Sequence, residues 1–477
     1  MSEILTPDLC VIGAGSGGLS VAAGASQMGA SVVLIERARM GGDCLNYGCV
    51  PSKSLIAAAH TAHVARAAER FGVRAGPLAI DGAAVFKRVH DVIAAIAPTD
   101  SVERFEGLGV KVIKAHARFT GPDRVRAGDV EIRSRRFVVA TGSSPMVPPI
   151  PGLDRVPHLT NESVFDLDAV PERLIVLGGG PIGIELAQAF RRLGARVAVI
   201  EMQTILGRDD PELADVVRRQ LAREGVDLFE KAPAESVERT THNGEGGIAV
   251  AVGGETPTRV EGTHLLVAVG RRPNVKDLGL DLAGVSVEPK GIVVDARLRT
   301  TNRRVFAIGD AAGGLQFTHV AGFHAGIVLR NILFRLPARA DRAAIPRVTY
   351  TDPELAQVGL TEAEAMARHD GVRILRWSMH DNDRAQAEGA TEGLVKAVIG
   401  RRGRILGAGI AATHGGELIQ PWTLAIANGL GIGAMASVVA PYPTLGEASK
   451  RAAGSYYTPT LFGDRTKAIV RLLARLG

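Results

Sequence analysis

The chain contains the stretch Gly41-Gly42-Asp43-Cys44-Leu45-Asn46-Tyr47-Gly48-Cys49-Val50-Pro51-Ser52-Lys53. This stretch holds two thiols five residues apart, Cys44 and Cys49. In a straight α-helix such positions lie roughly 8.7 Å apart, whereas a disulfide needs Cα atoms within about 7 Å. The turn between them must therefore be distorted, and Gly48 gives the backbone the freedom to do so.

The residues after the turn indicate the start of a helix. Pro51 suits the first turn of a helix, and the positive end of a helix dipole favours a thiolate. We therefore predict a redox-active dithiol/disulfide pair at a helix N-terminus. A pair of buried structural cysteines is the alternative, which the spacing alone leaves open.

Composition indicates an ordinary globular protein. At about 150 residues per domain, 477 residues suggest roughly three domains. The net charge of +6 is small for this length and needs no nucleic acid to explain it. Three cysteines are too few for a disulfide scaffold, and Cys10 falls in an apolar run typical of a core strand. With no N-terminal leader and no apolar run of about 18 residues, we expect no membrane span and a cytoplasmic location.

A dinucleotide-binding fingerprint precedes the cysteine pair. An apolar strand at 9–12 leads into a turn rich in glycine, a helical pattern to about residue 29, and a strand at 31–36 that ends in Glu36. This order lets backbone approach a pyrophosphate at the helix N-terminus, and an acid about 20 residues further on binds a ribose. A simple glycine-rich turn is the alternative. The residues of the turn that carry the fingerprint are Gly13, Gly15, Ser16 and Gly18.

The same unit recurs later in the chain. A strand at 173–177 leads into Gly178-Gly179-Gly180-Pro181-Ile182-Gly183, a helix through 192 and a strand ending in Glu201. Two such sites flanking a cysteine pair imply two nucleotides and a path for electrons. Glu201 would accept hydrogen bonds from a free ribose 2′-OH and repel a 2′-phosphate, and no arginine follows at 202–206. We therefore favour NADH over NADPH.

The remaining elements are expected from hydrophobic periodicity. Residues 54–115 suggest long helices, and residue 116 begins a β region. The expected strands are 137–142, 265–270, 305–310, 348–349, 394–398 and 405–411, and the expected helices are 318–334, 361–368, 417–428 and 445–453. The last segment, 465–476, is amphipathic, with Lys467, Arg471 and Arg475 on one face. We favour a packed helix with a solvated basic face over a helix on a membrane surface.

At this point the chain resembles the class I pyridine-nucleotide–disulfide oxidoreductases, which include dihydrolipoamide dehydrogenase, glutathione reductase and mercuric reductase. The motifs that carry the resemblance are GGDCLNYGCVPSK at 41–53, GGGPIGIE at 178–185, GRRPN at 270–274, FAIGD at 306–310, YTDPELAQVGLTE at 350–362 and YPTLGE at 442–447. The resemblance implies an α/β chain with two Rossmann-like domains and a C-terminal α+β dimerisation domain. The implied divisions are 1–150 and 273–340 for FAD, 151–272 for NAD(P), and 341–477 for a homodimer contact.

The resemblance also implies individual roles. FAD would be bound by Gly13, Gly15, Ser16, Gly18, Glu36, Gly42, Asp43, Lys53, Ala117, Thr141, Gly142, Asp310 and Thr318. The nicotinamide nucleotide would be bound by Gly178, Gly180, Gly183, Glu185, Glu201 and Gly270. NADH would reduce the flavin, which would pass two electrons to a Cys44–Cys49 disulfide. Cys49 would lie next to the flavin, Cys44 would attack the substrate, and Lys53 and Glu185 would form an ion pair near the flavin N5.

Tyr442, Asp43 and the C-terminal segment depart from the patterns of the family. Tyr442 stands where the thiol-substrate enzymes have a histidine, although Glu447 remains, so a catalytic and a packing role for Tyr442 are both open. A tyrosine with pKa near 10 is a poor base at neutral pH, so lipoamide or glutathione turnover should be slower by about 10²–10⁴-fold. Asp43 replaces a threonine and should raise the thiol pKa unless it is paired. Residues 450–477 lack the cysteine pair expected of a mercuric reductase.

The leading interpretation is an FAD-dependent NAD(P)H oxidoreductase that acts on a disulfide substrate, similar to dihydrolipoamide dehydrogenase. One alternative is a reductase of mercuric or other soft metal ions, because a dithiolate binds soft cations. Another is a quinone or oxygen diaphorase in which the cysteines are bystanders. A non-catalytic dinucleotide sensor is the alternative outside the enzymes.

Overall fold

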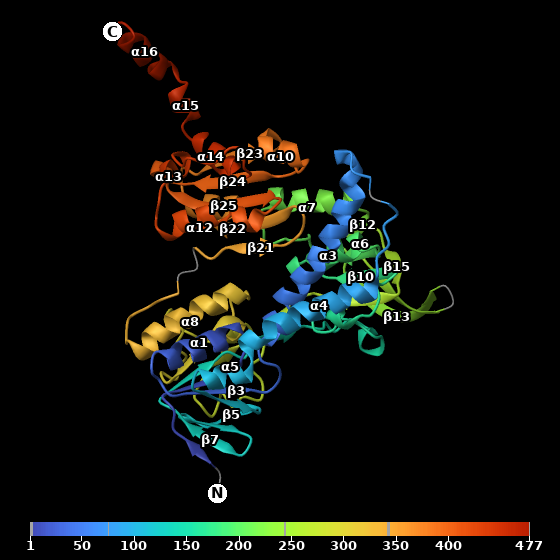
Figure 1. Cartoon of the computed structure of the whole chain (residues 1–477), viewed down its shortest axis with the longest axis vertical. Helices are drawn as coiled ribbons and strands as arrows, with labels where there is room; N and C mark the ends of the chain where they lie inside the picture. The colour runs from blue at the N-terminus through green and yellow to red at the C-terminus, as the bar shows by residue number, and fades with distance from the viewer. Residues whose placement is uncertain (1–2, 75, 243–244, 341–343, 477) are drawn as a thin grey trace. The chain divides into compact units, whose positions relative to one another are not determined.

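The structure is a computed structural model that describes residues 3–74, 76–242, 245–340 and 344–476 (Figure 1). The chain separates into two compact units, which are described one at a time. The first unit comprises Met1–Met202 with Lys231–Ala340, and the second comprises Gln203–Glu230 with Asp341–Gly477. None of the helices in the described ranges combines the length and apolar character that a membrane crossing requires.

Unit one contains a five-stranded parallel sheet. Its strands lie in the order β20 (Val305–Ala307), β8 (Arg136–Val139), β2 (Leu9–Ile12), β3 (Val32–Glu36) and β4 (Val110–Lys114). The prediction of helix throughout 54–115 is wrong at β4, where Val110, Val112 and Ile113 are β-branched and pair with β3. The helical part of that region is α3 (Cys49–Ala67), α4 (Gly82–Ile96) and α5 (Val102–Gly107).

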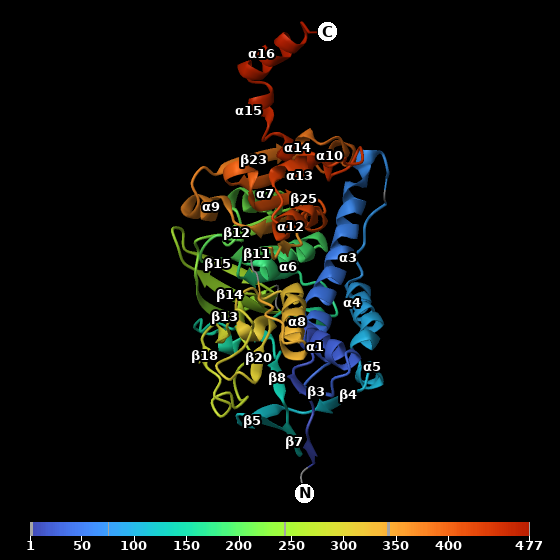
Figure 2. The same cartoon turned by 90° about the vertical axis from the view of Figure 1, so that its left-hand side faces the viewer.

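Two helices pack side by side against this sheet (Figures 1 and 2). They are α1 (Ser16–Gln27) and α8 (Thr318–Leu333). Glycines allow the close approach, since a Cβ on Gly24 would lie 2.7 Å from Leu329 Cδ1 and one on Gly17 would lie 3.2 Å from Ala321 Cβ. The packing fixes the N-termini of both helices near the ends of β2 and β20.

Unit one contains a second parallel sheet, in which a strand, a helix and a strand follow one another along the chain as β2, α1 and β3 do in the first. Its strands β11 (Arg196–Ile200), β10 (Arg173–Leu177) and β16 (His264–Val267) lie next to α6 (Pro181–Arg192). An antiparallel sheet of β13 (Ala234–His242), β14 (Glu245–Val252) and β15 (Thr258–Gly262) follows. The expected β region after residue 116 is present as β5 (Ala117–Gly121), β6 (Arg124–Ala127) and β7 (Val130–Arg133), joined by β1 (Ile4–Leu5).

Unit two is built on an antiparallel sheet with helices around it. The strand order is β21 (Arg347–Thr349), β22 (Glu354–Gly359), β25 (Ile405–Ala412), β24 (Leu394–Ile399) and β23 (Arg373–Ser378). The predicted helix 417–428 is divided into α11 (Gly415–Leu418) and α12 (Gln420–Ala427), with Pro421 in the first turn of α12. The other helices are α7 (Pro211–Arg223), α9 (Glu362–Arg368), α10 (Asp383–Glu388), α13 (Ile432–Ala436), α14 (Glu447–Gly454), α15 (Thr458–Leu461) and α16 (Asp464–Leu473).

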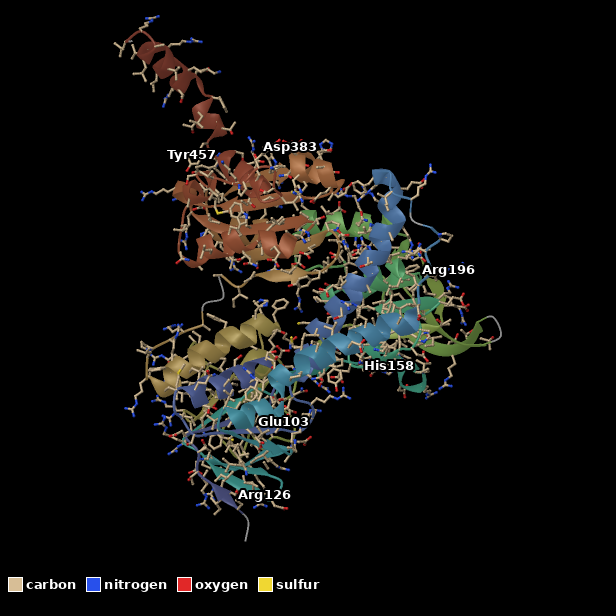
Figure 3. All side chains as sticks on the ribbon, viewed as in Figure 1. Glu103, Arg126, His158, Arg196, Asp383 and Tyr457 are labelled. Carbon is tan, nitrogen blue, oxygen red and sulfur yellow. The ribbon has the colours of Figure 1, made fainter. Side chains whose placement is uncertain are left out.

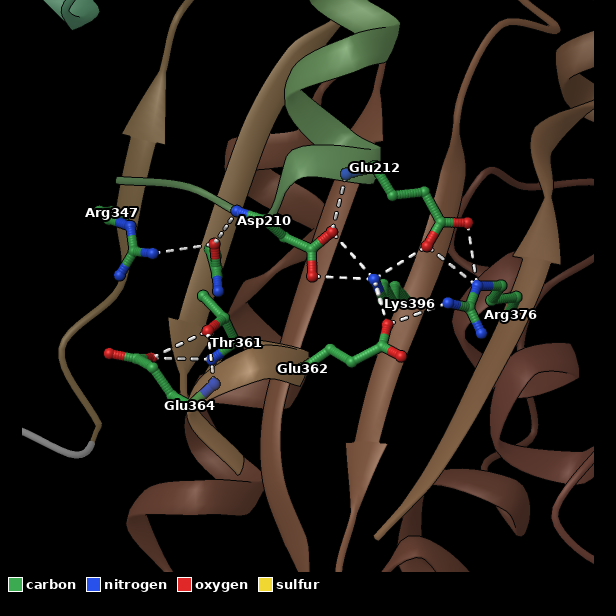
Figure 4. A network of polar contacts seen from close by, with 9 residues as sticks. Asp210, Glu212, Arg347, Thr361, Glu362, Glu364, Arg376 and Lys396 are labelled. Carbon is green, nitrogen blue, oxygen red and sulfur yellow. Dashed lines mark hydrogen bonds and ion pairs between the residues drawn. The ribbon is translucent and has the colours of Figure 1, made fainter. Parts of the chain in front are cut away.

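A buried lysine ties α7 to the sheet of unit two (Figure 4). Lys396 on β24 is 4% exposed, and its Nζ lies 2.8 Å from both Asp210 and Glu212 and 2.6 Å from Glu362. Asp210 also caps α7, because its Oδ1 accepts from the backbone N–H of Glu212 at 3.1 Å. The same carboxylate therefore begins a helix and compensates a buried cation.

Candidate active site

The cysteine loop adopts the distorted turn that the spacing predicts. Helix α2 (Gly42–Asn46) ends before Gly48, whose φ of −120° and ψ of −111° break the helix, and α3 begins at Cys49. A Cβ on Gly48 would lie 3.0 Å from the backbone oxygen of Asp43 and 2.8 Å from Asp43 Oδ2, so a larger residue would crowd the loop. Both thiols are free, and they are hydrogen-bonded to each other.

The surroundings of the two thiols separate their acidities. The hydrogen bond from Cys44 lowers the pKa of Cys49 to about 6; burial opposes this shift, whereas Thr318 and the charge of Lys53 assist it. Thr318 Oγ1, at the start of α8, lies 3.3 Å from Cys49 Sγ. The pKa of Cys44 is raised because its thiol is engaged with Cys49 and because it is buried. The negative charge of the reduced pair therefore resides on Cys49.

Lys53 and Glu185 form the ion pair that the sequence predicts. Lys53, one turn beyond Cys49 on α3, places Nζ 2.8 Å from Glu185 Oε2 on α6. The Glu185 side chain is 7% exposed and that of Lys53 is 35% exposed. The pair joins the helix that follows the cysteine loop to the helix that follows the second glycine-rich turn.

Asp43 is paired, but its negative charge still opposes the lowering of the Cys49 pKa. Its Oδ1 lies 2.9 Å from Arg271 Nη2 and accepts from Asn161 Nδ2 at 3.2 Å. Arg271 also donates to Ser143 Oγ and Ser143 O, each at 2.8 Å, and Ser143 Oγ donates to Asp310 Oδ2 at 2.6 Å. A continuous polar chain thus links the cysteine loop to Asp310, and the pKa of Cys49 stays below its ordinary value.

The first glycine-rich turn has the backbone that a dinucleotide requires. Gly13 has φ +103°, and a Cβ on Gly18 would lie 1.9 Å from Gly13 O. Gly15 is the N-cap of α1. Glu36 accepts from the backbone N–H groups of Ala14 and Ala38, each at 2.7 Å, which fixes its carboxylate at the end of β3.

A cavity opens at this turn and tests whether the residues fit FAD. Four of the predicted FAD residues line it together, namely Gly13, Glu36, Ala117 and Thr141. Glycine backbone at one side and a fixed carboxylate at another suit an adenosine ribose. The N-terminus of α1, which has no side-chain cap, suits a pyrophosphate because the first N–H groups of a helix lack intrahelical partners. The donor set therefore fits the adenosine end of FAD.

The other predicted FAD residues lie around the cysteine loop or at nearby strand ends. Ser16 is hydrogen-bonded to Cys44 Sγ, and a Cβ on Gly42 would lie 2.6 Å from Gly15 Cα. Gly142 has φ +67°. Burial raises the pKa of Asp310, although the hydrogen bond from Ser143 opposes this shift.

The second glycine-rich turn repeats the geometry of the first. Gly178 has φ +108°, and a Cβ on Gly183 would lie 2.1 Å from Gly178 O. Gly180 is the N-cap of α6. Glu201 accepts from the backbone N–H of Gly179 at 2.7 Å, as Glu36 does from Ala14. Gly270 lies just before β17 (Arg271–Pro273), with φ +142°.

Tyr442 and Glu447 belong to unit two. Tyr442 is 70% exposed, and its hydroxyl donates to Asp383 Oδ2 at 2.8 Å. Its side chain is therefore not packed within its own unit. Glu447 begins α14 and accepts from Arg451 Nη2 at 2.8 Å.

Four polar residues of the site were not predicted as site residues. They are Ser143, Asn161, Arg271 and Asn274. Arg271 and Asn274 lie in the quoted GRRPN motif, in which only Gly270 was assigned a role. Instead, β17 pairs antiparallel with β9 (Ser143–Pro145), which brings that motif beside the cysteine loop. Asn274 accepts at its backbone oxygen from Thr141 Oγ1 at 2.6 Å.

The chain matches two family profiles. Residues 7–325 match the profile described as pyridine nucleotide-disulphide oxidoreductase, and residues 345–453 match the dimerisation domain of the same family. A mercuric reductase of Streptomyces lividans is 36% identical over 457 residues, covering 94% of this chain and 96% of that protein. A dihydrolipoyl dehydrogenase of Thermus scotoductus is 35% identical over 470 residues, covering 94% and 97%.

Solved structures show the same fold. LpdA from Mycobacterium tuberculosis superposes with a TM-score of 0.86 at 28% identity, covering 95% of this chain and 99% of that one. The Cu(II) complex of the HOCl-induced flavoprotein disulfide reductase RclA from Escherichia coli gives 0.84 at 27%, covering 94% and 99%. The chain therefore belongs to the pyridine nucleotide-disulphide oxidoreductase family and is an FAD-dependent NAD(P)H oxidoreductase.

Proposed function

We propose that this protein oxidises NADH and reduces a disulfide substrate at Cys44 and Cys49. The observation that carries the proposal is the hydrogen-bonded thiol pair at the start of α3, with its negative charge on Cys49. Bound FAD supplies the transfer of two electrons from the nicotinamide to the sulfur pair. The overall balance is one NADH and one proton for each substrate disulfide, giving NAD⁺ and two thiols.

The resemblance assigns the attack on the substrate to Cys44, and the acidity of Cys49 supports its role in the second step. Cys44 gives up its thiol proton as it attacks one sulfur of the substrate, the substrate S–S bond breaks, and the leaving thiolate takes up that proton. Cys49 then attacks Cys44, which releases the second thiol and restores the Cys44–Cys49 disulfide. Cys49 suits this second step because its pKa of about 6 keeps it a thiolate at neutral pH.

Thiol counting tests the proposal. The purified FAD-bound protein is reduced with NADH without oxygen, and its thiols are titrated before and after. We expect a gain of thiols that Cys44→Ala abolishes together with turnover of oxidised lipoamide. Cys10→Ala is the matched control, because Cys10 is fully buried in β2. No gain of thiols would exclude the proposal, and binding of both nucleotides without turnover of any acceptor would indicate a sensor.

A soft-metal reductase is the second candidate. Two adjacent sulfurs suit a soft cation, and Tyr442 replaces the histidine of the thiol-substrate enzymes. Relatives of this chain are named mercuric reductases, and RclA was solved as a Cu(II) complex. This candidate predicts NADH consumption that depends on Hg²⁺ or Cu²⁺ and disappears in Cys44→Ala. Turnover of quinones that survives Cys44→Ala would indicate a diaphorase instead.

We propose NADH as the preferred donor. The Glu201 carboxylate, held by the Gly179 N–H, would accept from a ribose 2′-OH and repel a 2′-phosphate. Glu201→Ala should lower the ratio of kcat/KM for NADH to that for NADPH. Glu103→Gln, an exposed change in α5, serves as the control.

We also propose the division of labour along the chain. Residues 1–150 and 273–340 would bind FAD, 151–272 would bind the nicotinamide nucleotide, and 341–477 would form a homodimer, in keeping with the dimerisation profile at 345–453. Each dimer partner would supply residues such as Tyr442 to a substrate site. A cytoplasmic location accords with the use of three cysteines as thiols rather than as structural disulfides.

A further inference from the structure

The last part of the chain leaves the folded core of unit two as an amphipathic helix. Helix α14 still packs, with Ala448, Ala452 and Ala453 fully buried. Tyr456 is the last anchor, because the Arg373 guanidinium lies 4.2 Å from its ring and donates to its carbonyl oxygen at 3.1 Å. Beyond Tyr457, α15 and α16 project away from the rest of the unit (Figures 1 to 3), and none of their described residues is buried. The prediction that the last segment packs on its own domain is therefore wrong.

The apolar residues of this segment form one face. At 3.6 residues per turn, Ile469, Leu472 and Leu473 lie on the same side of α16, and Leu476 follows three residues beyond its end. Leu472 is 59% exposed and Leu476 is 77% exposed. Phe462, just before α16, is 69% exposed. A continuous apolar stripe of this kind marks an interaction surface.

The charges of the segment favour one kind of partner. Lys467 and Arg471 lie on the opposite face of α16, and Arg475 follows just beyond its end. Arg465 lies one turn before Ile469 on the side of the stripe, and Asp464 is the one acid from residue 464 to 476. A second copy of the helix carries the same excess of positive charge and offers no complement to it. An anionic lipid surface complements it, and a basic face opposite leucine and phenylalanine is typical of helices that lie in a membrane interface.

We propose that residues 458–476 are a reversible anchor for an anionic membrane surface. The stripe of Ile469, Leu472, Leu473 and Leu476 would enter the boundary between headgroups and acyl chains, and the basic face would meet anionic headgroups. A homodimer would present two such helices, which raises the affinity through effective concentration. This inference does not depend on which acceptor the enzyme reduces.

Vesicle cosedimentation of the full-length FAD-bound protein tests the anchor. The probes are vesicles of phosphatidylcholine with phosphatidylglycerol and vesicles of phosphatidylcholine alone. We expect binding to the anionic vesicles that weakens as salt is raised. Leu472→Ser/Leu473→Ser should lower the affinity by roughly tenfold or more for each leucine. Lys467→Gln/Arg471→Gln/Arg475→Gln should lower it by about fivefold for each charge.

Two controls keep the test decisive. Met366→Ser removes an apolar side chain that is 56% exposed on α9 and should leave vesicle binding unchanged. The oligomeric state and the unfolding temperature of each variant are measured in parallel, without lipid. Absence of binding to anionic vesicles, or binding that the double leucine variant retains, would overturn the proposal. Loss of the dimer in the double leucine variant would also overturn it, because the stripe would then contact a second copy.

Discussion

Arg271 and Asp43 join two segments far apart in the sequence through an ion pair of 2.9 Å. The Arg271 side chain is 10% exposed, and its Nε and Nη2 donate to Ser143, which in turn donates to Asp310. The aspartate that distinguishes this cysteine loop is therefore the counter-charge of a nearly buried arginine. The negative charge of Asp43 also acts on Cys49, where it opposes the lowering of the thiol pKa.

Asp43→Asn should lower the pKa of Cys49 further, because a nearby negative charge is removed. The midpoint of iodoacetamide alkylation of the reduced protein should then move to lower pH. The free energy of unfolding should also fall by about 1–2 kcal/mol. This loss is smaller than that expected for a fully buried pair, because Asp43 is 39% exposed. Asp129→Asn, an exposed change in unit one, is the control. An unchanged or higher midpoint would contradict the electrostatic account.

Thr318→Val should raise the pKa of Cys49, because it removes the hydroxyl that lies 3.3 Å from the sulfur. The alkylation midpoint should rise above the value of about 6 that the intact site favours. Thr318→Ser keeps the hydroxyl and should keep the midpoint. An unchanged midpoint in Thr318→Val, or an equal rise in Thr318→Ser, would contradict the assignment of this effect to the hydroxyl.

Lys53→Met should destabilise the FAD-bound protein by about 2–4 kcal/mol, because Glu185 stays 7% exposed without this cation. Denaturant unfolding measures the change. Lys87→Met is the matched control: Lys87 pairs with Asp91 on α4, but both side chains are more than half exposed. That change should stay within about 0.5 kcal/mol. Equal losses of stability in the two variants would contradict the claim that the burial of Glu185 makes the loss of its partner costly.

Lys396→Met should destabilise unit two by about 3–5 kcal/mol, because Asp210 is left 4% exposed without the cation that compensates it. Hydrogen bonds from Arg376 and Lys396 hold the pKa of Glu212 below its ordinary value although burial opposes them. A carboxylate with a lowered folded pKa stabilises above its unfolded pKa, and this contribution is lost as the pH falls through the folded pKa. The variant should therefore lose less stability on acidification below about pH 4 than the wild type.

Tyr442→His should raise turnover of a disulfide substrate by about a hundredfold, the lower end of general acid–base catalysis. The hydrogen bond to Asp383 raises the pKa of Tyr442, which makes it a still weaker acid at neutral pH. The histidine variant should add an inflection near pH 6.5 to the rate profile, whereas Tyr442→Phe should add none. Equal rates in all three proteins would place Tyr442 outside the substrate site.

The sequence predicted those elements whose signals are local. Glycine turns between apolar strands, an acid at the next strand end and the break at Gly48 each follow from a few adjacent residues, and the structure contains them. The spacing of the cysteines predicted the loop at the start of a helix, and the family motifs predicted the Lys53–Glu185 pair.

Other features depend on contacts between distant segments. The hydrophobic residues show no clear change of periodicity between the preceding helices and strand β4, so only the pairing of β4 with β3 identifies it. Arg271 could not be assigned to the cysteine loop from sequence, because β17 reaches it by pairing with β9. The Lys396 network likewise unites residues that lie far apart along the chain.

Anaerobic titration of the FAD-bound protein with NADH, followed by visible absorbance, tests the central claim most directly. With the thiolate on Cys49, reduction by two electrons should produce a long-wavelength absorbance band while the flavin stays oxidised, and Cys49→Ala should abolish that band. Bleaching of the flavin without the band in the unmodified protein would contradict the account, because the electrons would then not reach the cysteine pair.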